Sequence, residues 1–183
     1  ELYLKIESKE EKSDYLDLST RNGILAIRTK QIRYIEGSRN YQDIYLDGKK
    51  DPIEVKMTMQ QLEEIAAVSD VIFIALPHGH AMKIGKQLRG SNVKIIDLGG
   101  DYRFRDYHVF EEWYHVQHED PTAQAVYGLT ELFRDQVKGA SLVANPGCYT
   151  TCSILAMVPL LKYKLIETKG IVIDAKSGTT GAG

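Results

Sequence analysis

The chain has 183 residues, of which 43% are hydrophobic and 26% charged, and its formal net charge is −2. This length suits one ordinary domain or two small ones. The charge gives no general attraction to nucleic acids or anionic membranes. No apolar run reaches membrane-spanning length, and the spacing of Cys148 and Cys152 is neither a redox nor a zinc motif. We therefore expect a cytoplasmic protein with no membrane partner and no bound metal.

The first part of the chain shows the alternation of apolar and polar residues that is typical of β-strands. Such runs occupy residues 2–6, 15–18, 24–27, 32–36, 41–46 and 53–55. Asn22-Gly23 and Asp47-Gly48 are hairpin-type turn signals between them. The pattern predicts an antiparallel sheet with one solvated face, followed by a helix from an N-cap at Thr58 to about Ala67.

From Asp70 onward the pattern changes to continuous apolar runs, which predict strands buried on both faces of a parallel sheet. These runs lie at residues 71–76, 93–98 and 170–175. A helix over residues 81–88 joins the first two runs into a βαβ unit, whereas residues 97–137 show little periodicity. We predict an α/β protein with partial parallel-sheet, Rossmann-like and catalytic segments (residues 65–183). A small, mainly antiparallel β domain precedes them (residues 1–64).

An apolar run at Leu142–Ala144 ends in Asn145-Pro146-Gly147, a strong turn signal, and helical spacing follows. Cys148 is therefore expected in this turn or in the first residues of the helix. The free N–H groups and the positive end of the dipole at such a helix start stabilise a thiolate, as a covalent catalyst requires. The alternative is a small buried hydrophobic residue, since free cysteines are often buried.

Five segments, in order, resemble motifs of the N-acetyl-gamma-glutamyl-phosphate reductase family, an NADPH-dependent group of enzymes in arginine biosynthesis. They are residues 70–79 (DVIFIALPHG), 97–103 (DLGGDYR), 126–132 (VYGLTEL), 142–149 (LVANPGCY), and 174–178 (DAKSG) with 181–183 (GAG). The resemblance covers residues 65–183, nearly two thirds of the chain. It implies an oxidoreductase that acts on an acyl phosphate, uses NADP and forms a homo-oligomer.

The resemblance also implies roles for individual residues. Cys148 would attack the acyl phosphate and form a thioester, which is a good hydride acceptor. The substrate pocket would include Asn145, Gly147 and Tyr149, while Arg103 would bind an anionic substrate group or pair with a neighbouring acid. The residues implied to lie against NADPH are Pro77, His78, Gly79, Ser177 and Gly178. Each also has an ordinary interpretation: a loop histidine can be a surface residue, and a glycine can serve a turn.

The sequence departs from this family at several points. The family's first strand is followed by a glycine-rich loop of the G-A-T-G-Y-T-G kind, which holds cofactor phosphates at a helix N-terminus. Residues 1–69 contain no such loop. The family's catalytic histidine falls beyond Gly183, and the chain begins at Glu1, so we expect it to be cut at both ends. Without the first family strand, the run at residues 71–76 should have an exposed edge, which invites aggregation or pairing with the β domain.

Residues 15–65 resemble the LytTR-type DNA-binding domain of bacterial response regulators. The similarity rests on residues 32–41 (IRYIEGSRNY) and on the following strand, Asp-Gly turn and helix. It implies a second hypothesis, a transcriptional regulator in which Arg39, Asn40 and Lys56 contact DNA. The alternative is a solvated sheet face, since acidic residues slightly outnumber basic ones in residues 1–65.

Overall fold

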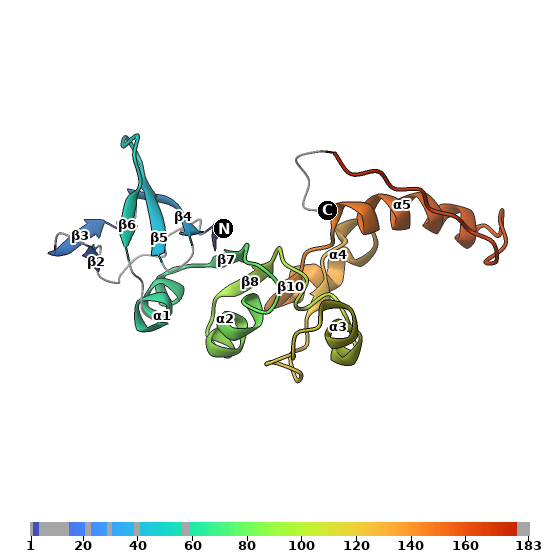
Figure 1. Ribbon diagram of the computed structural model, residues 1–183, viewed down its shortest axis with the longest axis horizontal. Coiled ribbons are helices and arrows are strands. Elements are labelled where there is room, and N and C mark those ends of the chain that lie inside the picture. The colour runs from blue at the N-terminus through green and yellow to red at the C-terminus, as the bar shows by residue number, and fades with distance from the viewer. Residues whose placement is uncertain are drawn as a thin grey trace. The chain divides into compact units, whose positions relative to one another are not determined.

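The computed structural model describes residues 2–3, 15–20, 23–28, 31–38, 41–55 and 59–178 (Figure 1). The chain forms two compact units, Glu1–Asn145 and Pro146–Gly183. The predicted N-cap Thr58 and the three predicted DNA contacts, Arg39, Asn40 and Lys56, lie outside the described residues. None of the described helices is both long and apolar enough to cross a lipid bilayer.

Five strands of the first unit form the antiparallel sheet that the alternation predicted, in the order β3-β2-β6-β5-β4. The prediction that the run at residues 2–6 also belongs to this sheet is wrong, because Leu2–Tyr3 pairs in the other sheet. They are β2 (Tyr15–Thr20), β3 (Gly23–Arg28), β4 (Ile32–Ser38), β5 (Tyr41–Leu46) and β6 (Ile53–Val55). In β2 the side chains of Leu16 and Leu18 are buried and those of Tyr15 and Asp17 are exposed. This sheet therefore has one packed and one solvated face, as predicted.

The helix α1 (Met59–Val68) leads into a second sheet with the order β1-β7-β8-β10-β9. Its four parallel strands are β7 (Val71–Ile74), β8 (Lys94–Asp97), β9 (Val126–Tyr127) and β10 (Leu142–Ala144). The helix α2 (Ala81–Leu88) connects β7 to β8. The predicted α/β class and the predicted βαβ unit are confirmed.

The outer edge of β7 is covered in part by β1 (Leu2–Tyr3), which pairs with it antiparallel. Leu2 lies opposite Ile74, and Tyr3 lies opposite Phe73. The edge that was expected to be exposed is thus covered over these two positions by the N-terminal part of the chain. Of the two consequences expected of such an edge, the structure shows pairing.

Two helices fill the region in which the sequence showed no periodicity, namely α3 (Tyr107–Tyr114) and α4 (Thr130–Gly139). Only Phe110 of α3 is fully buried, and no residue of α4 is. Each helix does space apolar residues at intervals of three and four, as at Phe110 and Tyr114 in α3 and at Phe133 and Val137 in α4, but these runs are short and lie among many polar and aromatic residues. The carboxylate of Asp106 caps α3, accepting the N–H of His108 at 3.0 Å.

One cluster of buried apolar side chains runs from the antiparallel sheet through α1 to the parallel sheet. Its fully buried members include Leu18, Ile44, Ile65, Ile72 and Ile74. A second cluster, around Met82, Tyr102 and Phe110, lies on the other side of α2 and supports the loops described below. The predicted division into domains at residues 64 and 65 stays a prediction.

The second unit contains α5 (Cys148–Lys162) and an extended segment after it. The strand predicted over residues 170–175 is wrong, because this segment forms none. Val172 is 88% exposed and Ile173 is 57% exposed. A continuous apolar run indicates a buried strand only where another strand pairs with it, and the described residues 146–178 contain no such partner.

Candidate active site

The carboxyl ends of three parallel strands meet at one edge of the sheet, and hydrogen bonds between their next residues extend the pairing. The N–H of Leu98 donates to the carbonyl oxygen of Ile74, and the N–H of Asn145 donates to that of Asp97, both at 2.8 Å. The N–H of Gly128 donates to the carbonyl oxygen of Ala144 at 2.7 Å. In open parallel sheets, ligands bind at this edge. Most of the residues singled out in the sequence of the first unit lie here.

Arg103 links the loops that follow β8 and β10. Its Nε donates to the carbonyl oxygen of Asn145 at 2.8 Å, and its Nη2 donates to that of Leu98 at 2.9 Å. Both bonds go to main-chain carbonyl oxygens. They do not show the pairing with a neighbouring acid that was one of the two predictions for Arg103. They fix the guanidinium group at the sheet edge, and the guanidinium has further N–H groups that can donate to other acceptors. Substrate binding by Arg103 and Asn145 stays a prediction.

Asp97, the last residue of β8, is a fully buried carboxyl group directly beneath this edge. Its Oδ1 accepts the N–H of Gly99 at 2.8 Å, whereas its Oδ2 has no hydrogen-bond partner among the described residues. Burial, with a smaller contribution from the charge of Asp101, raises the pKa of Asp97 to about 6. The Gly99 bond and the Arg103 charge oppose this rise. Asp97 belongs to the family-like segment at residues 97–103, but the sequence predicted no role for it.

The loop at residues 77–80 connects β7 to α2 and carries three of the predicted cofactor contacts. Gly79 is buried with a φ of +87°, in the left-handed region that favours glycine, and a Cβ atom there would stand 2.9 Å from Cγ1 of Val116. Pro77 and His78 are exposed, and the His78 ring lies 4.3 Å from the ring of Tyr114. The structure therefore gives Gly79 a conformational role and presents His78 at the surface.

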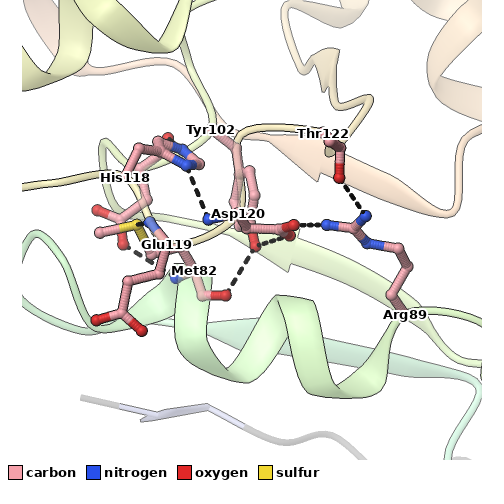
Figure 2. A network of polar contacts seen from close by, with 8 residues as sticks. Met82, Arg89, Tyr102, His118, Glu119, Asp120 and Thr122 are labelled. Carbon is pink, nitrogen blue, oxygen red and sulfur yellow. Dashed lines mark hydrogen bonds and ion pairs between the residues drawn. The ribbon is translucent and has the colours of Figure 1, made fainter.

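Buried polar side chains beneath this loop form a network that sequence reasoning did not identify (Figure 2). The hydroxyl group of Tyr102 lies 2.9 Å from Oδ2 of Asp120 and 3.2 Å from the carbonyl oxygen of Met82. Asp120 also forms an ion pair with Arg89. Burial and the negative charge of Asp97 raise the pKa of Tyr102, so the phenol stays protonated. The network joins α2 to the segment at residues 118–122.

A cavity of about 270 Å³ opens beside this network. The residues that line it include Arg103, Arg105, Tyr107, Tyr127 and Asp120. Because Asp120 is already paired with Arg89, Arg103 and Arg105 give the remaining wall a positive character. Such a cavity suits a small anionic molecule.

In the second unit, Cys148 is the first residue of α5 and Gly147 is its N-cap. This position confirms the prediction that the cysteine stands at the start of a helix. Cys148 is exposed, and so is Cys152 one turn later, so the alternative of a buried hydrophobic cysteine is wrong. The carbonyl oxygen of Gly147 accepts the N–H of Thr151 and the hydroxyl of Thr150, both at 2.9 Å. Tyr149 is 38% exposed.

The other two predicted cofactor contacts, Ser177 and Gly178, lie near the end of the described chain. Both are exposed, and Oγ of Ser177 donates to the carbonyl oxygen of Gly178 at 3.2 Å. They belong to the second unit, whereas the loop at residues 77–80 belongs to the first. Their contact with a cofactor stays a prediction.

A parallel sheet with a βαβ unit and a polar edge at its strand ends is the architecture of Rossmann-like α/β domains. The model of the semialdehyde dehydrogenase NAD-binding domain matches residues 33–140, and that of the semialdehyde dehydrogenase dimerisation domain matches residues 148–183. The chain belongs to the semialdehyde dehydrogenase family. No match supports the LytTR-type resemblance, and the NAD-binding match takes in part of that segment.

Curated relatives share the name N-acetyl-gamma-glutamyl-phosphate reductase. The one from Pelotomaculum thermopropionicum is 52% identical over 124 residues, which cover 67% of this chain and 36% of the relative. The one from Desulforudis audaxviator is 53% identical over 117 residues, covering 63% of this chain and 34% of the relative. The one from Campylobacter jejuni subsp. doylei is 42% identical over 159 residues, covering 84% and 45%. The chain thus spans between a third and a half of these relatives.

The described residues fit a dinucleotide only in part. A pyrophosphate group binds where helix N–H groups are free, but at the start of α2 the carboxylate of Asp101 already accepts the N–H groups of Gly79 and Met82. The exposed ring of His78, in contrast, is a surface on which an uncharged ring or ribose of the cofactor can pack.

Proposed function

We propose that this chain carries the acyl-transfer part of an NADP-dependent reductase that converts N-acetyl-glutamyl phosphate to its semialdehyde in arginine biosynthesis. The observation that carries the proposal is the exposed Cys148 at the first position of α5. The relatives of about 50% identity that bear the reductase name support it. So does the sequence LVANPGCY at residues 142–149, which resembles the corresponding motif of that family.

The proposed chemistry has two stages. The Cys148 thiolate attacks the acyl carbon, so that a sulfur–carbon bond forms, the bond from that carbon to the phosphate oxygen breaks, and inorganic phosphate leaves. The cofactor, when bound, supplies a hydride that reduces the resulting thioester. The carbonyl group then re-forms as the sulfur–carbon bond breaks, which releases the aldehyde and restores the thiolate.

The other proposed roles are those of binding and orientation. Gly147 and Asn145 precede the nucleophile and shape its turn, and Tyr149 follows it. Arg103 holds the carbonyl oxygen of Asn145 at 2.8 Å, and its remaining N–H groups are available to an anionic part of the substrate. NADP would meet Pro77, His78 and Gly79, with Ser177 and Gly178 from the second unit. The dimerisation-domain match supports a homo-oligomer, and a cytoplasmic location stays a prediction.

Covalent capture of the substrate tests the proposal without any need for the cofactor. The full chain would be incubated with N-acetyl-glutamyl phosphate, quenched in acid and digested, and the acylated peptide identified by mass spectrometry. We expect one acyl group, removable by hydroxylamine, on Cys148. The Cys148→Ser variant should yield no hydroxylamine-sensitive adduct.

The matched control is Cys152→Ala, which removes the neighbouring exposed thiol four residues later on the same helix and should acylate normally. Acylation of Cys152 in place of Cys148, or no acylation of either thiol, would contradict the proposed nucleophile. Acetyl phosphate serves as a comparison substrate. Equal reaction with both acyl phosphates would show that the chain carries reactivity without the proposed substrate preference.

A further inference from the structure

The N-terminus of α2 is closed by a residue that lies far from it in the sequence. The residue at the N-cap position, His80, makes no side-chain capping bond. Oδ1 of Asp101 instead accepts the N–H of Gly79 at 2.9 Å, and its Oδ2 accepts the N–H of Met82 at 3.0 Å. Asp101 is only 2% exposed. One of the N–H groups that a helix start normally offers to an external anion, that of Met82, and the N–H of Gly79 just ahead of the helix are therefore bonded within the protein.

Asp101 is itself held by the segment at residues 118–120. Nε2 of His118 lies 2.8 Å from the carbonyl oxygen of Asp101, and Nδ1 of His118 accepts the N–H of Asp120 at 3.1 Å. A carbonyl oxygen can only accept, so the imidazole carries its proton on Nε2. Figure 2 shows His118 and Asp120 beside Tyr102, whose hydroxyl group contacts both Asp120 and Met82. The carboxylate thus has a fixed place under the loop.

The position of Asp101 determines the shape of the loop at residues 77–80. Its bond to Gly79 holds the residue whose φ is +87°, directly after His78. The His78 ring is then confined between Tyr114, 4.3 Å away, and Gly100, where a Cβ atom would stand only 2.9 Å from Nδ1 of the ring. Loss of the Asp101 bonds should therefore change the environment of His78 at the surface.

We propose that Asp101 is the positioning residue of this loop and takes the place of a cofactor phosphate at the start of α2, so that the loop meets an uncharged part of the dinucleotide through His78. A phosphate near this helix start would find the N–H groups of Gly79 and Met82 occupied and a carboxylate in front of it. Like charges at such short range repel each other. The contact between His78 and the dinucleotide rests on the proposed function, whereas the role of Asp101 within the loop does not.

The experiment uses the ¹⁵N-labelled full chain and follows the amide signals of Gly79 and Met82 and the ring signals of His78. Inorganic pyrophosphate at millimolar concentration should leave both amide signals of the unmodified protein in place. A saturable shift of either signal would show that an anion displaces Asp101 and would overturn the proposal. This measurement needs no variant, so it stands even if a substitution impairs folding.

The variant Asp101→Asn keeps the size of the side chain but can accept only one of the two N–H groups. Hydrogen exchange of the Gly79 and Met82 amides should become at least about tenfold faster, as expected for a lost bond to a charged acceptor, and the His78 ring signals should move. The matched control is Asp106→Asn, which alters an equivalent cap on α3 and should leave these signals unchanged. Exchange rates within about twofold of the unmodified protein would overturn the positioning role.

Titration with NADPH tests the proposed cofactor contact separately from the proposed role of Asp101. We expect the His78 ring signals to respond while the Gly79 and Met82 amide signals stay in place. If NADPH shifts the two amide signals instead, the phosphate does reach the helix start and the inference is wrong. If no signal of this loop responds, the contact with the cofactor under the proposed function is wrong, and the pyrophosphate and exchange measurements still decide the role of Asp101.

Discussion

Gly85 of α2 lies directly against the hydroxyl end of Tyr102. A Cβ atom at this glycine would stand 3.0 Å from both Cε2 and Cζ of the ring, and closer still to the hydroxyl oxygen. Tyr102 cannot retreat without losing its contacts with Asp120 and Met82. The missing side chain at Gly85 is therefore a condition for the polar network beneath the loop at residues 77–80.

The substitution Gly85→Ala should destabilise the protein. Overpacking costs about 1–3 kcal/mol, which exceeds the roughly 1 kcal/mol by which alanine is favoured over glycine inside a helix. The free energy of unfolding would be measured in urea by circular dichroism. Gly139→Ala is the control, since Gly139 ends α4 with no atom within 4 Å of its would-be Cβ. Equal effects of the two substitutions would show that Tyr102 moves aside freely.

The ion pair between Arg89 and Asp120 should contribute more to the free energy of unfolding than the exposed ion pair between Lys83 and Glu119. Asp120 is 2% exposed and Arg89 is 44% exposed, so Arg89→Met leaves a buried carboxylate without its cation. We expect a loss of about 1–3 kcal/mol, less than for a fully buried pair because water reaches the arginine. Unfolding in urea again provides the measurement.

The control for this pair is Lys83→Met, which breaks the exposed ion pair between Lys83 of α2 and Glu119. Its effect should stay below about 1 kcal/mol. Equal losses from the two substitutions would contradict a special role for the buried carboxylate of Asp120.

The buried carboxyl group of Asp97 should make stability depend on pH. Its pKa is about 6 in the folded protein, against an ordinary value of 3.8, so the folded state binds the proton more tightly than the unfolded state. The stability that the protonated form gives is fully present below pH 3.8 and is lost as the pH rises through 6. The total loss is about 3 kcal/mol at roughly 1.4 kcal/mol per pKa unit.

The substitution Asp97→Asn should remove this dependence. The stability of the unmodified protein relative to the variant should therefore fall between about pH 4 and pH 7, as measured by urea unfolding at a series of pH values. Asp135→Asn, at an exposed position of α4, controls for the loss of a surface charge. A relative stability that rises with pH would show that the Asp97 carboxylate is favoured in the fold.

Iodoacetamide near neutral pH should alkylate Cys148 faster than Cys152. Both thiols are exposed, but Cys148 is at the first position of α5, whereas Cys152 lies one turn further on and donates to the carbonyl oxygen of Tyr149 at 3.2 Å. A helix-start preference of about 0.3–1 kcal/mol corresponds to a rate ratio of about two to five. Peptide mass spectrometry over time measures both rates. Equal or reversed rates would remove the physical basis for Cys148 as the nucleophile.

The chain of 183 residues should bind NADPH more weakly than micromolar. Residues 1–69 contain no closely spaced glycines, and Asp101 already accepts the N–H groups of Gly79 and Met82 near the start of α2. Several charge-assisted hydrogen bonds, worth about 1.5–3 kcal/mol each, are then missing. Calorimetric titration with NADPH gives the dissociation constant. A micromolar value would show that residues 1–69 complete the cofactor site in a way that the sequence does not reveal.

Periodicity was enough to predict the elements that bury a regular face. The strand β2 and the βαβ unit of β7, α2 and β8 were recognised within a few residues, because alternation and helical spacing follow from burial. The Asn145-Pro146-Gly147 turn likewise placed Cys148 at the start of a helix, where it lies. In both cases the determining interactions are local in sequence.

The rest depends on partners that are distant in sequence. Asp101 caps a helix that begins 20 residues earlier, and Asp120 meets Arg89 across 31 residues, so no local pattern announces either contact. The apolar run at residues 170–175 failed as a strand for the same reason, because a strand exists only when another strand pairs with it. The residue types indicated candidate functional side chains, whereas the tertiary fold determines which of these side chains contact one another.

The pairing of β1 with β7 has a consequence for the order of folding. Tyr3 lies opposite Phe73, so the two strands can join only after the ends of a long intervening segment have come together, which is slow compared with closing a hairpin. The antiparallel pairs β2–β3 and β4–β5 are hairpins between neighbouring segments and should form early. The β1–β7 pair should therefore form late in refolding and be the first contact of its sheet to open in hydrogen exchange.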